Sequence, residues 1–283
     1  MAADAGLVQG SVGAALRFVR ENLRFVAITA AIFAVASTAI AALSMLGQTL
    51  SIVAMVGIGL AQTFAYAAFL GAALFGAQAA RGRWSMDGWR VWSAMALIGL
   101  FLCIVMIVLT IPVSIALAAG PMVPYVADLQ AAGSDQAAVM AVMTRFLNEN
   151  AGVMLLVMLF YGVVWLLLTS RLYLAAPASV EAGRMLTFET WKWTRGHTLK
   201  IVGARLMLLL PAYILMFALS ALVSRVFGFN ALDAASVQAA TTANPVGVMI
   251  YQLINGFIVT ALYASLEAGL SAHLYRGLKP PTA

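Results

Sequence analysis

The chain has 283 residues, of which 64% are hydrophobic and only 9% charged, and its formal net charge is +6. A soluble domain carries roughly 25% charged residues, so this composition excludes a water-soluble globular protein and indicates a polytopic membrane protein. The basic residues are spread along the chain and form no separate basic domain, which argues against a nucleic-acid-binding protein.

Six segments are apolar over the length of about 20 residues that a helix needs to cross a hydrocarbon layer of roughly 30 Å. In chain order they cover about residues 25–46, 52–77, 93–118, 151–170, 206–224 and 245–266. Their apolar runs are continuous, whereas strands of a membrane β-barrel alternate apolar and polar residues. We therefore predict an all-α bundle of six transmembrane helices, with residues 1–283 forming a single integral membrane domain.

The basic residues divide unevenly between the two sides that six spans define. If the N-terminus is cytoplasmic, fourteen lysines and arginines lie inside, and only Arg145 and Arg225 lie outside. Cytoplasmic loops of membrane proteins carry an excess of Lys and Arg, so this bias predicts that both termini are cytoplasmic.

Three short segments precede outward-directed spans, and we predict that they form interfacial helices in the headgroup layer. They cover about residues 11–24, 85–92 and 187–196. The hexapeptides SMDGWR at 85–90 and TFETWK at 187–192 share a hydroxyl, an apolar residue, an acid, a tryptophan and a base in the same order. Such aromatic and basic side chains are typical of helices at a membrane surface. The shared plan indicates three repeats of an interfacial helix followed by a two-span hairpin.

The third segment carries the densest aromatic and basic cluster of the chain. There, Thr187 is expected to cap a helix that has Glu189 in its first turn. The candidate interfacial, lipid or partner contacts are Arg171, Glu181, Trp191, Lys192, Trp193, Arg195, Trp89 and Arg90. An acid in a basic region facing anionic lipid needs a cation, so Glu181 is expected to pair with Arg171 or Arg195. Its replacement by Gln should lower stability, whereas a comparable change at the outer Asp135 should have no effect. The alternative interpretation of the cluster is an aromatic belt that only fixes helix depth.

The residues from Arg171 to Gly196 resemble a signature of six-span bacterial membrane proteins that include the membrane domain of glycerophosphodiester phosphodiesterases. That signature has Arg at the end of a span, then Pro, Glu and Ser-Trp-x-Leu-Thr-Lys-Gly. The corresponding residues here are Arg171, Pro177, Glu181 and TWKWTRG at 190–196, with Thr, Trp and Arg in place of Ser, Leu and Lys. The resemblance implies a six-span protein of the bacterial inner (plasma) membrane. In that family the phosphodiesterase activity belongs to a separate soluble domain, for which this chain has no room.

No motif for catalysis, a cofactor or a metal is found in the sequence. Two histidines, His197 and His273, lack a second ligand at metal spacing, although Glu181 and Glu267 could join them in space. The outer segment at about 119–150 contains no histidine that could assist a hydrolase. We therefore predict a protein that is not an enzyme and has no cofactor.

Ionisable residues are expected at the inner ends of the spans and not at their centres. Arg171, Arg205 and Glu267 can reach the interface there by snorkelling, and Glu267 is expected to pair with Arg171 or Arg205. Uncharged polar residues within the spans can either line a cavity or link helices. They are Gln62, Tyr66, Thr110, Gln252, Asn255 and Tyr263.

The functional hypothesis is a non-enzymatic inner-membrane protein that organises lipid or assists a partner through its cytoplasmic interfacial helices. Its expected partners are membrane lipids with anionic headgroups and a further membrane protein, and not nucleic acid. The alternative is a transporter or channel for a small or lipidic solute. A transporter needs a polar cavity that reaches the midplane of the membrane, whereas a scaffold can have a closed apolar bundle.

Overall fold

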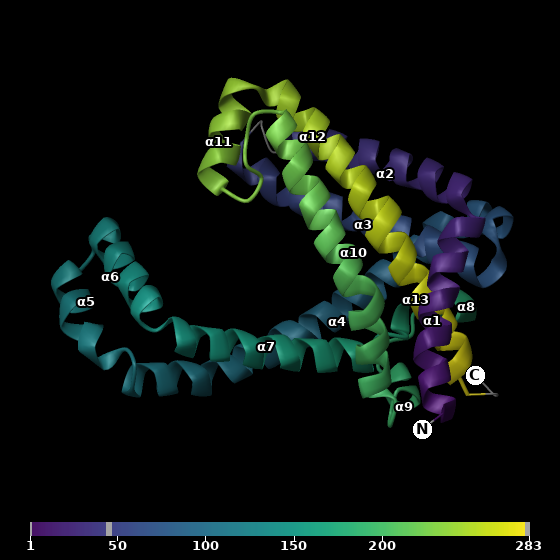
Figure 1. Cartoon of the computed structure of the whole chain (residues 1–283), viewed down its shortest axis with the longest axis horizontal. Helices are drawn as coiled ribbons and strands as arrows, with labels where there is room; N and C mark the ends of the chain where they lie inside the picture. The colour runs from purple at the N-terminus through teal and green to yellow at the C-terminus, as the bar shows by residue number, and fades with distance from the viewer. Residues whose placement is uncertain (1, 44–46, 281–283) are drawn as a thin grey trace. The chain divides into compact units, whose positions relative to one another are not determined.

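The computed structural model describes residues 2–43 and 47–280, with side chains from residue 8 onward except those of residues 48 and 49 (Figure 1). The described residues form helices joined by turns and loops, without a strand. Six helical segments of this part of the chain are long and apolar enough to cross a membrane: Leu23–Leu43, Leu50–Phe75, Ala77–Ala119, Ala151–Ala182, Thr198–Val226 and Pro245–Leu278. The all-α fold with six membrane helices is thus confirmed, and the chain is a multi-pass membrane protein. The last three residues of the first predicted span, 44–46, lie outside the described residues.

The chain divides into two compact units where the sequence predicted a single domain. Unit 1 comprises residues 1–96 and 170–283, and unit 2 comprises residues 97–169. The helices α4 (Ala77–Ala119) and α7 (Ala151–Arg171) belong in part to each unit.

Unit 1 contains the N-terminal helices, the start of α4 and all elements after α7. These are α1 (Ala2–Glu21), α2 (Leu23–Leu43), α3 (Gln48–Phe75), α8 (Ala175–Ala182), α9 (Thr190–Trp193), α10 (Thr198–Val226), α11 (Ala234–Ala243), α12 (Pro245–Ile258), the π-helix η3 (Val259–Ala264) and α13 (Ser265–Leu278). Figure 1 shows α12 and α13 as one long segment, with α2 packed on α12 and α1 on α13. The core of the unit is built from Phe69, Leu70, Leu174, Ile201, Leu270 and Leu274, all fully buried.

Small residues let the helices of unit 1 approach closely. A Cβ added at Gly269 of α13 would lie 3.0 Å from Ala15 Cα of α1, and one at Gly256 of α12 would lie 3.6 Å from Ala34 Cα of α2. In a membrane, helices gain little from mutual burial of apolar surface, so such close backbone packing is a main source of their association.

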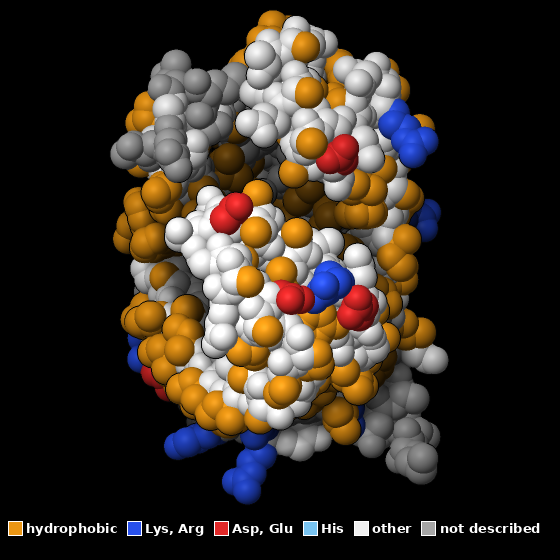
Figure 2. Space-filling view, turned by 90° about the vertical axis from the view of Figure 1, so that its left-hand side faces the viewer, with side chains coloured by type: hydrophobic (Ala, Val, Ile, Leu, Met, Phe, Trp, Pro, Cys, Tyr) orange, Lys and Arg blue, Asp and Glu red, His pale blue; other side chains and the backbone are white. Residues whose placement is uncertain are grey.

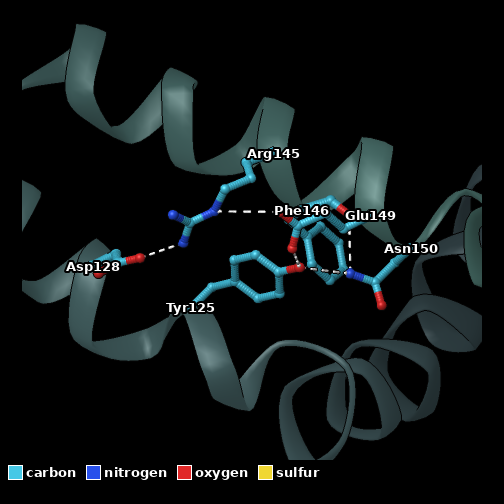
Figure 3. A network of polar contacts seen from close by, with 6 residues as sticks. All are labelled: Tyr125, Asp128, Arg145, Phe146, Glu149 and Asn150. Carbon is cyan, nitrogen blue, oxygen red and sulfur yellow. Dashed lines mark hydrogen bonds and ion pairs between the residues drawn. The ribbon is translucent and has the colours of Figure 1, made fainter.

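In unit 2, the end of α4 is joined to the start of α7 through η2 (Val123–Tyr125), α5 (Val126–Ala132) and α6 (Gln136–Glu149). Figure 3 shows how Tyr125 lies between these helices: its hydroxyl donates to Glu149 and accepts from Asn150, and its ring packs edge-on against Phe146. The hydrogen bond to the Glu149 carboxylate raises the pKa of Tyr125. The network therefore holds the phenol in its neutral, donating form.

Asp135, whose replacement was expected to have no effect, makes hydrogen bonds in the structure. Its carboxylate caps α6 by accepting hydrogen bonds from the backbone N–H groups of Ala137 and Ala138. The first N–H groups of a helix have no partner within the helix, so an aspartate at this position stabilises the helix start.

Hydrophobic and uncharged side chains cover most of the face drawn in Figure 2. The exposed residues of α4 and α7 include Leu100, Ile104, Leu156 and Met158. Large exposed apolar surfaces of this kind are expected where a helix faces lipid instead of water.

Two of the three predicted interfacial helices are wrong as separate helices. Residues 85–92 lie inside α4, which runs without a break from Ala77 to Ala119 because neither Gly82 nor Gly88 interrupts a helix that is otherwise well packed. Residues 187–196 contain only the single turn α9, since the backbone turns at Gly183 (φ +65°) and Gly196 (φ +81°). The first predicted interfacial helix, at about residues 11–24, corresponds to the separate helix α1, which ends at Glu21. The similarity of the two hexapeptides thus does not reflect a shared local structure.

Candidate functional site

A cavity of about 190 Å³ lies beside Glu267 in unit 1. The polar side chains in its wall are Gln62, Thr63 and Tyr66 of α3, Thr260 and Tyr263 of the π-helix, and Glu267 of α13. All of them belong to segments that are long and apolar enough to span the membrane. A polar cavity therefore exists within the helix bundle of this unit.

Glu267 is the charged residue of this cavity. Its side chain is half-buried, and no hydrogen bond joins its carboxylate to another described residue. The positive charge of Arg205, one of the two partners expected from the sequence, interacts electrostatically with this carboxylate. An ionisable residue in a membrane helix is costly to bury and is most often explained by a function.

Arg205 is itself held by residues at the end of α7 and just after it. Its Nη1 donates to Ser170 Oγ at 2.8 Å, and its guanidinium lies 4.8 Å above the ring of Tyr173. Next to it, the buried hydroxyl of Tyr173 has no hydrogen-bond partner in the part of the chain that the structure describes, whereas that of Tyr66 lies 2.9 Å from Ser271 Oγ. The surroundings of Glu267 thus combine the positive charge of Arg205, held in place by its contacts, with the Tyr173 hydroxyl, which can still form a hydrogen bond.

A second cavity, of about 200 Å³, adjoins the first. Gln62 and Val259 stand in the walls of both, and the second is further lined by Thr38, Gln252 and Asn255. The side-chain oxygens of these last three residues are buried and have no hydrogen-bond partner among the described residues. Buried polar atoms are nearly always satisfied by protein or water, so these oxygens need a water or another donor in the cavity.

The π-helix between α12 and α13 belongs to the wall of both cavities. Val259, Thr260, Tyr263 and Ala264 of its six residues line the first cavity, and Val259 lines the second. A π-helical turn widens the backbone locally and gives up regular hydrogen bonds, and such turns occur often at functional sites. We refer to the two cavities and the residues named above as the polar track.

Sequence reasoning named most of the polar track without recognising it as a site. Thr38, Thr63 and Thr260 were missed, while Gln62, Gln252 and Asn255 were considered for a cavity or as links between helices. The usable signal is the spacing of Gln252, Asn255, Val259, Tyr263 and Glu267, which recur every three or four residues and so lie along one face of a helix.

The candidate residues around Trp191 form a separate cluster. The guanidinium of Arg171 lies 5.1 Å from the Trp191 ring, and Thr194 Oγ1 donates to the Arg171 carbonyl at 2.8 Å. The Trp193 ring lies 6.2 Å from that of Tyr275. These contacts fasten the loop at 183–197 to α13 and to the end of α7.

Glu181 pairs with neither of its two expected partners. Lys279 Nζ lies 2.8 Å and 3.0 Å from its two carboxylate oxygens. The signature at residues 171–196 suggested Arg171 and Arg195, but α8 packs against α13, and Lys279 directly follows that helix. Glu181 thus binds a basic side chain as predicted, but this side chain is Lys279 and neither of the two arginines.

The structure does not have Thr187 as the helix cap that the sequence predicted. Its backbone N–H donates to Glu189 Oε2 at 3.1 Å. Hydrogen bonds from backbone N–H groups of Glu189 and Thr187 lower the pKa of Glu189. A depressed pKa means that this bond stabilises the loop at neutral pH and is lost as the pH falls through the native pKa of the carboxyl group.

The remaining candidates lie on the surface, bond within their own helix or pack against a neighbouring helix. Lys192 and Arg195 are exposed. Arg90 Nη1 bonds to Asp87 Oδ1 at 2.7 Å, and Trp89 packs edge-on against Phe64. His273 lines a cavity with Arg17 and Arg276, and among the residues that the structure describes, no three His, Cys, Asp or Glu side chains are grouped as metal ligands would be.

The Glu181–Lys279 pair leads to a modest prediction. Replacing Glu181 with Gln is expected to lower the free energy of unfolding by about 0.5–1 kcal/mol, because both side chains are only about one-third exposed but remain in contact with water. Thermal denaturation in detergent measures this loss, with Glu21→Gln on the exposed face of α1 as the matched control. A Glu181→Gln melting temperature equal to that of the control would show that the pair contributes nothing.

Comparison of the chain with protein-family models, with curated proteins and with solved structures finds no match.

Proposed function

We propose that the protein is a transporter or channel that passes a small polar or positively charged solute along the polar track of unit 1. The observation that carries the proposal is a half-buried carboxylate, Glu267, in a cavity whose neighbour contains three buried oxygens without a protein partner. A protein that only organises lipid has no need of such groups within its spans, because each costs free energy in an apolar medium.

The lining indicates the chemistry of the solute. The lining offers the carboxylate of Glu267 together with the amide oxygens of Gln252 and Asn255 and the hydroxyl oxygen of Thr38, all of which accept hydrogen bonds. Cavities of about 190 and 200 Å³ are smaller than the roughly 300 Å³ at which pockets for drug-sized molecules begin. Protons, small cations and small ammonium compounds match both the charge and the size.

Flux into proteoliposomes tests the proposal. Vesicles loaded with ion-sensitive dyes are exposed to gradients of protons, sodium, potassium and methylammonium. The wild-type protein should pass at least one of these faster than empty vesicles do, and Glu267→Gln should lose that flux, whereas Glu181→Gln should retain it. Equal flux through wild type and Glu267→Gln would refute the assignment.

The proposed orientation places both termini in the cytoplasm of a bacterial inner membrane. It is supported by the fourteen-to-two distribution of basic residues and by the resemblance of residues 171–196 to six-span bacterial membrane proteins. Reporter fusions after residues 84 and 186 are expected to report cytoplasm, and those after 130 and 235 the outer side. A cytoplasmic signal from residue 130 would contradict this topology.

The organisation of lipid, or the assistance of a partner, through the inner loops remains a second candidate function. Its support is a groove of about 450 Å³ in unit 1 that combines the aromatic rings of Trp193 and Tyr275 with Arg184 and Glu189. The exposed Lys192 and Arg195 lie on the same loop, at residues 183–197. Neither candidate requires covalent chemistry, a cofactor or a nucleic acid.

A further inference from the structure

A cleft of about 460 Å³ runs along one face of α2 in unit 1 and is almost entirely apolar. Phe25, Ile28, Ile32 and Phe33 of α2 line it, together with Ala36. Its opposite wall is formed by α3 and the start of α4. The cleft shares no lining residue with the polar track, so it is an independent feature of the unit.

The length of the cleft matches one leaflet of a bilayer. Its lining on α2 extends from residue 25 to residue 36, which at a rise of 1.5 Å per residue corresponds to about 16 Å. Half of a hydrocarbon core of roughly 30 Å is about 15 Å. An acyl chain of one leaflet can therefore lie along the whole cleft.

A single charged side chain stands in the wall of the cleft. Arg81 of α4 is exposed, and no described residue pairs with it. Beside it, the Trp84 ring is fixed by edge-on contacts with Phe33 at 6.0 Å and with Phe64 at 5.9 Å. A tryptophan next to a cation is typical of the level at which lipid headgroups lie.

We propose that this cleft binds one acyl chain of an anionic phospholipid whose phosphate is held by Arg81. The apolar wall favours the acyl chain through the many van der Waals contacts that close packing provides. The guanidinium of Arg81 favours a phosphate through charge-assisted hydrogen bonds. In the orientation proposed above, Arg81 belongs to the inner side, whose leaflet carries anionic lipid.

Native mass spectrometry of the delipidated full-length protein tests the site, with phosphatidylglycerol and phosphatidylcholine of identical chains as probes. The wild type should bind phosphatidylglycerol more tightly. Arg81→Gln should weaken phosphatidylglycerol binding roughly fivefold, as expected for the loss of one basic contact at a headgroup. It should weaken phosphatidylcholine binding less, because the choline cation offsets the charge of that phosphate. Ala36→Phe, which fills the cleft, should weaken binding of both lipids.

Arg20→Gln is the matched control, because Arg20 is an exposed arginine on α1 that does not line the cleft. It should bind both lipids as the wild type does, and lipid-free melting temperatures identify any variant that fails to fold. The proposal is overturned if the wild type binds both lipids equally, if Arg81→Gln keeps the wild-type preference, or if Ala36→Phe leaves binding unchanged.

Discussion

Replacing Asp87 with alanine is expected to destabilise the protein by about 2–3 kcal/mol, the largest loss that we predict for a single side chain. The Asp87 side chain is only 1% exposed, and its two oxygens lie 2.7 Å from Arg90 Nη1 and 3.4 Å from Arg83 Nε. Removing one partner of a buried ion pair costs about 3–5 kcal/mol, and the estimate is lower here because both arginines can still reach water. Arg83 also donates to the Val180 carbonyl at 3.2 Å, so the change loosens the contact of α4 with α8.

The matched control for this change is Asp128→Ala in unit 2. Asp128 pairs with Arg145, but the two side chains are about half exposed, and exposed ion pairs contribute about 0–1 kcal/mol. Thermal denaturation in detergent should therefore show a clear drop in melting temperature for Asp87→Ala and a small one for Asp128→Ala. Equal drops would mean that burial of Asp87 carries no energetic weight.

Replacing Gly88 with alanine is expected to cost about 1–3 kcal/mol, although alanine is the better helix former. A Cβ at this position would lie 2.6 Å from the Phe64 ring, well inside van der Waals contact. The ring cannot easily move away, because Trp84 and Trp89 pack edge-on against it at 5.9 Å and 5.3 Å. The start of α4 should therefore separate from α3, and the melting temperature should fall.

Gly82→Ala, in the same helix, isolates the steric effect. A Cβ at Gly82 meets no atom within 4 Å, so this change should be neutral or stabilise the helix by about 0.5–1 kcal/mol. The two glycine variants should thus differ in sign. If Gly88→Ala is as stable as Gly82→Ala, α3 and α4 do not approach each other at Phe64 as closely as the structure shows.

The membrane helices could be predicted from the sequence because their signal is local. A continuous apolar run such as residues 151–170 meets the length requirement without reference to any other part of the chain, and the structure has α7 at Ala151–Arg171. The ends of helices depend on packing and were less predictable. The span predicted to begin at about residue 93 belongs to a helix that begins at Ala77, and the first turns of this helix contact α3 at Gly88 and α8 through Arg83.

The candidate site could be predicted only in part, because its meaning depends on which helices meet. The polar stripe from Gln252 to Glu267 is visible in the sequence, but nothing local indicates that Gln62 of α3 faces it. The same limit explains Glu181, whose partner Lys279 lies 98 positions away. Two polar stripes that meet form a cavity, whereas either one alone is indistinguishable from residues that link helices.

The accessibility of the polar track to water tests the central claim most directly. In a Cys103→Ala background, single cysteines at Asn255 and Gln62 are treated in membranes with a charged, membrane-impermeant thiol reagent, and Val35→Cys on the exposed apolar face of α2 is the control. A hydrated pathway predicts that the cysteines at 255 and 62 react while the one at 35 does not. If the cysteines at 255 and 62 are as unreactive as the one at 35, the track is closed to water and the protein does not pass a polar solute through unit 1.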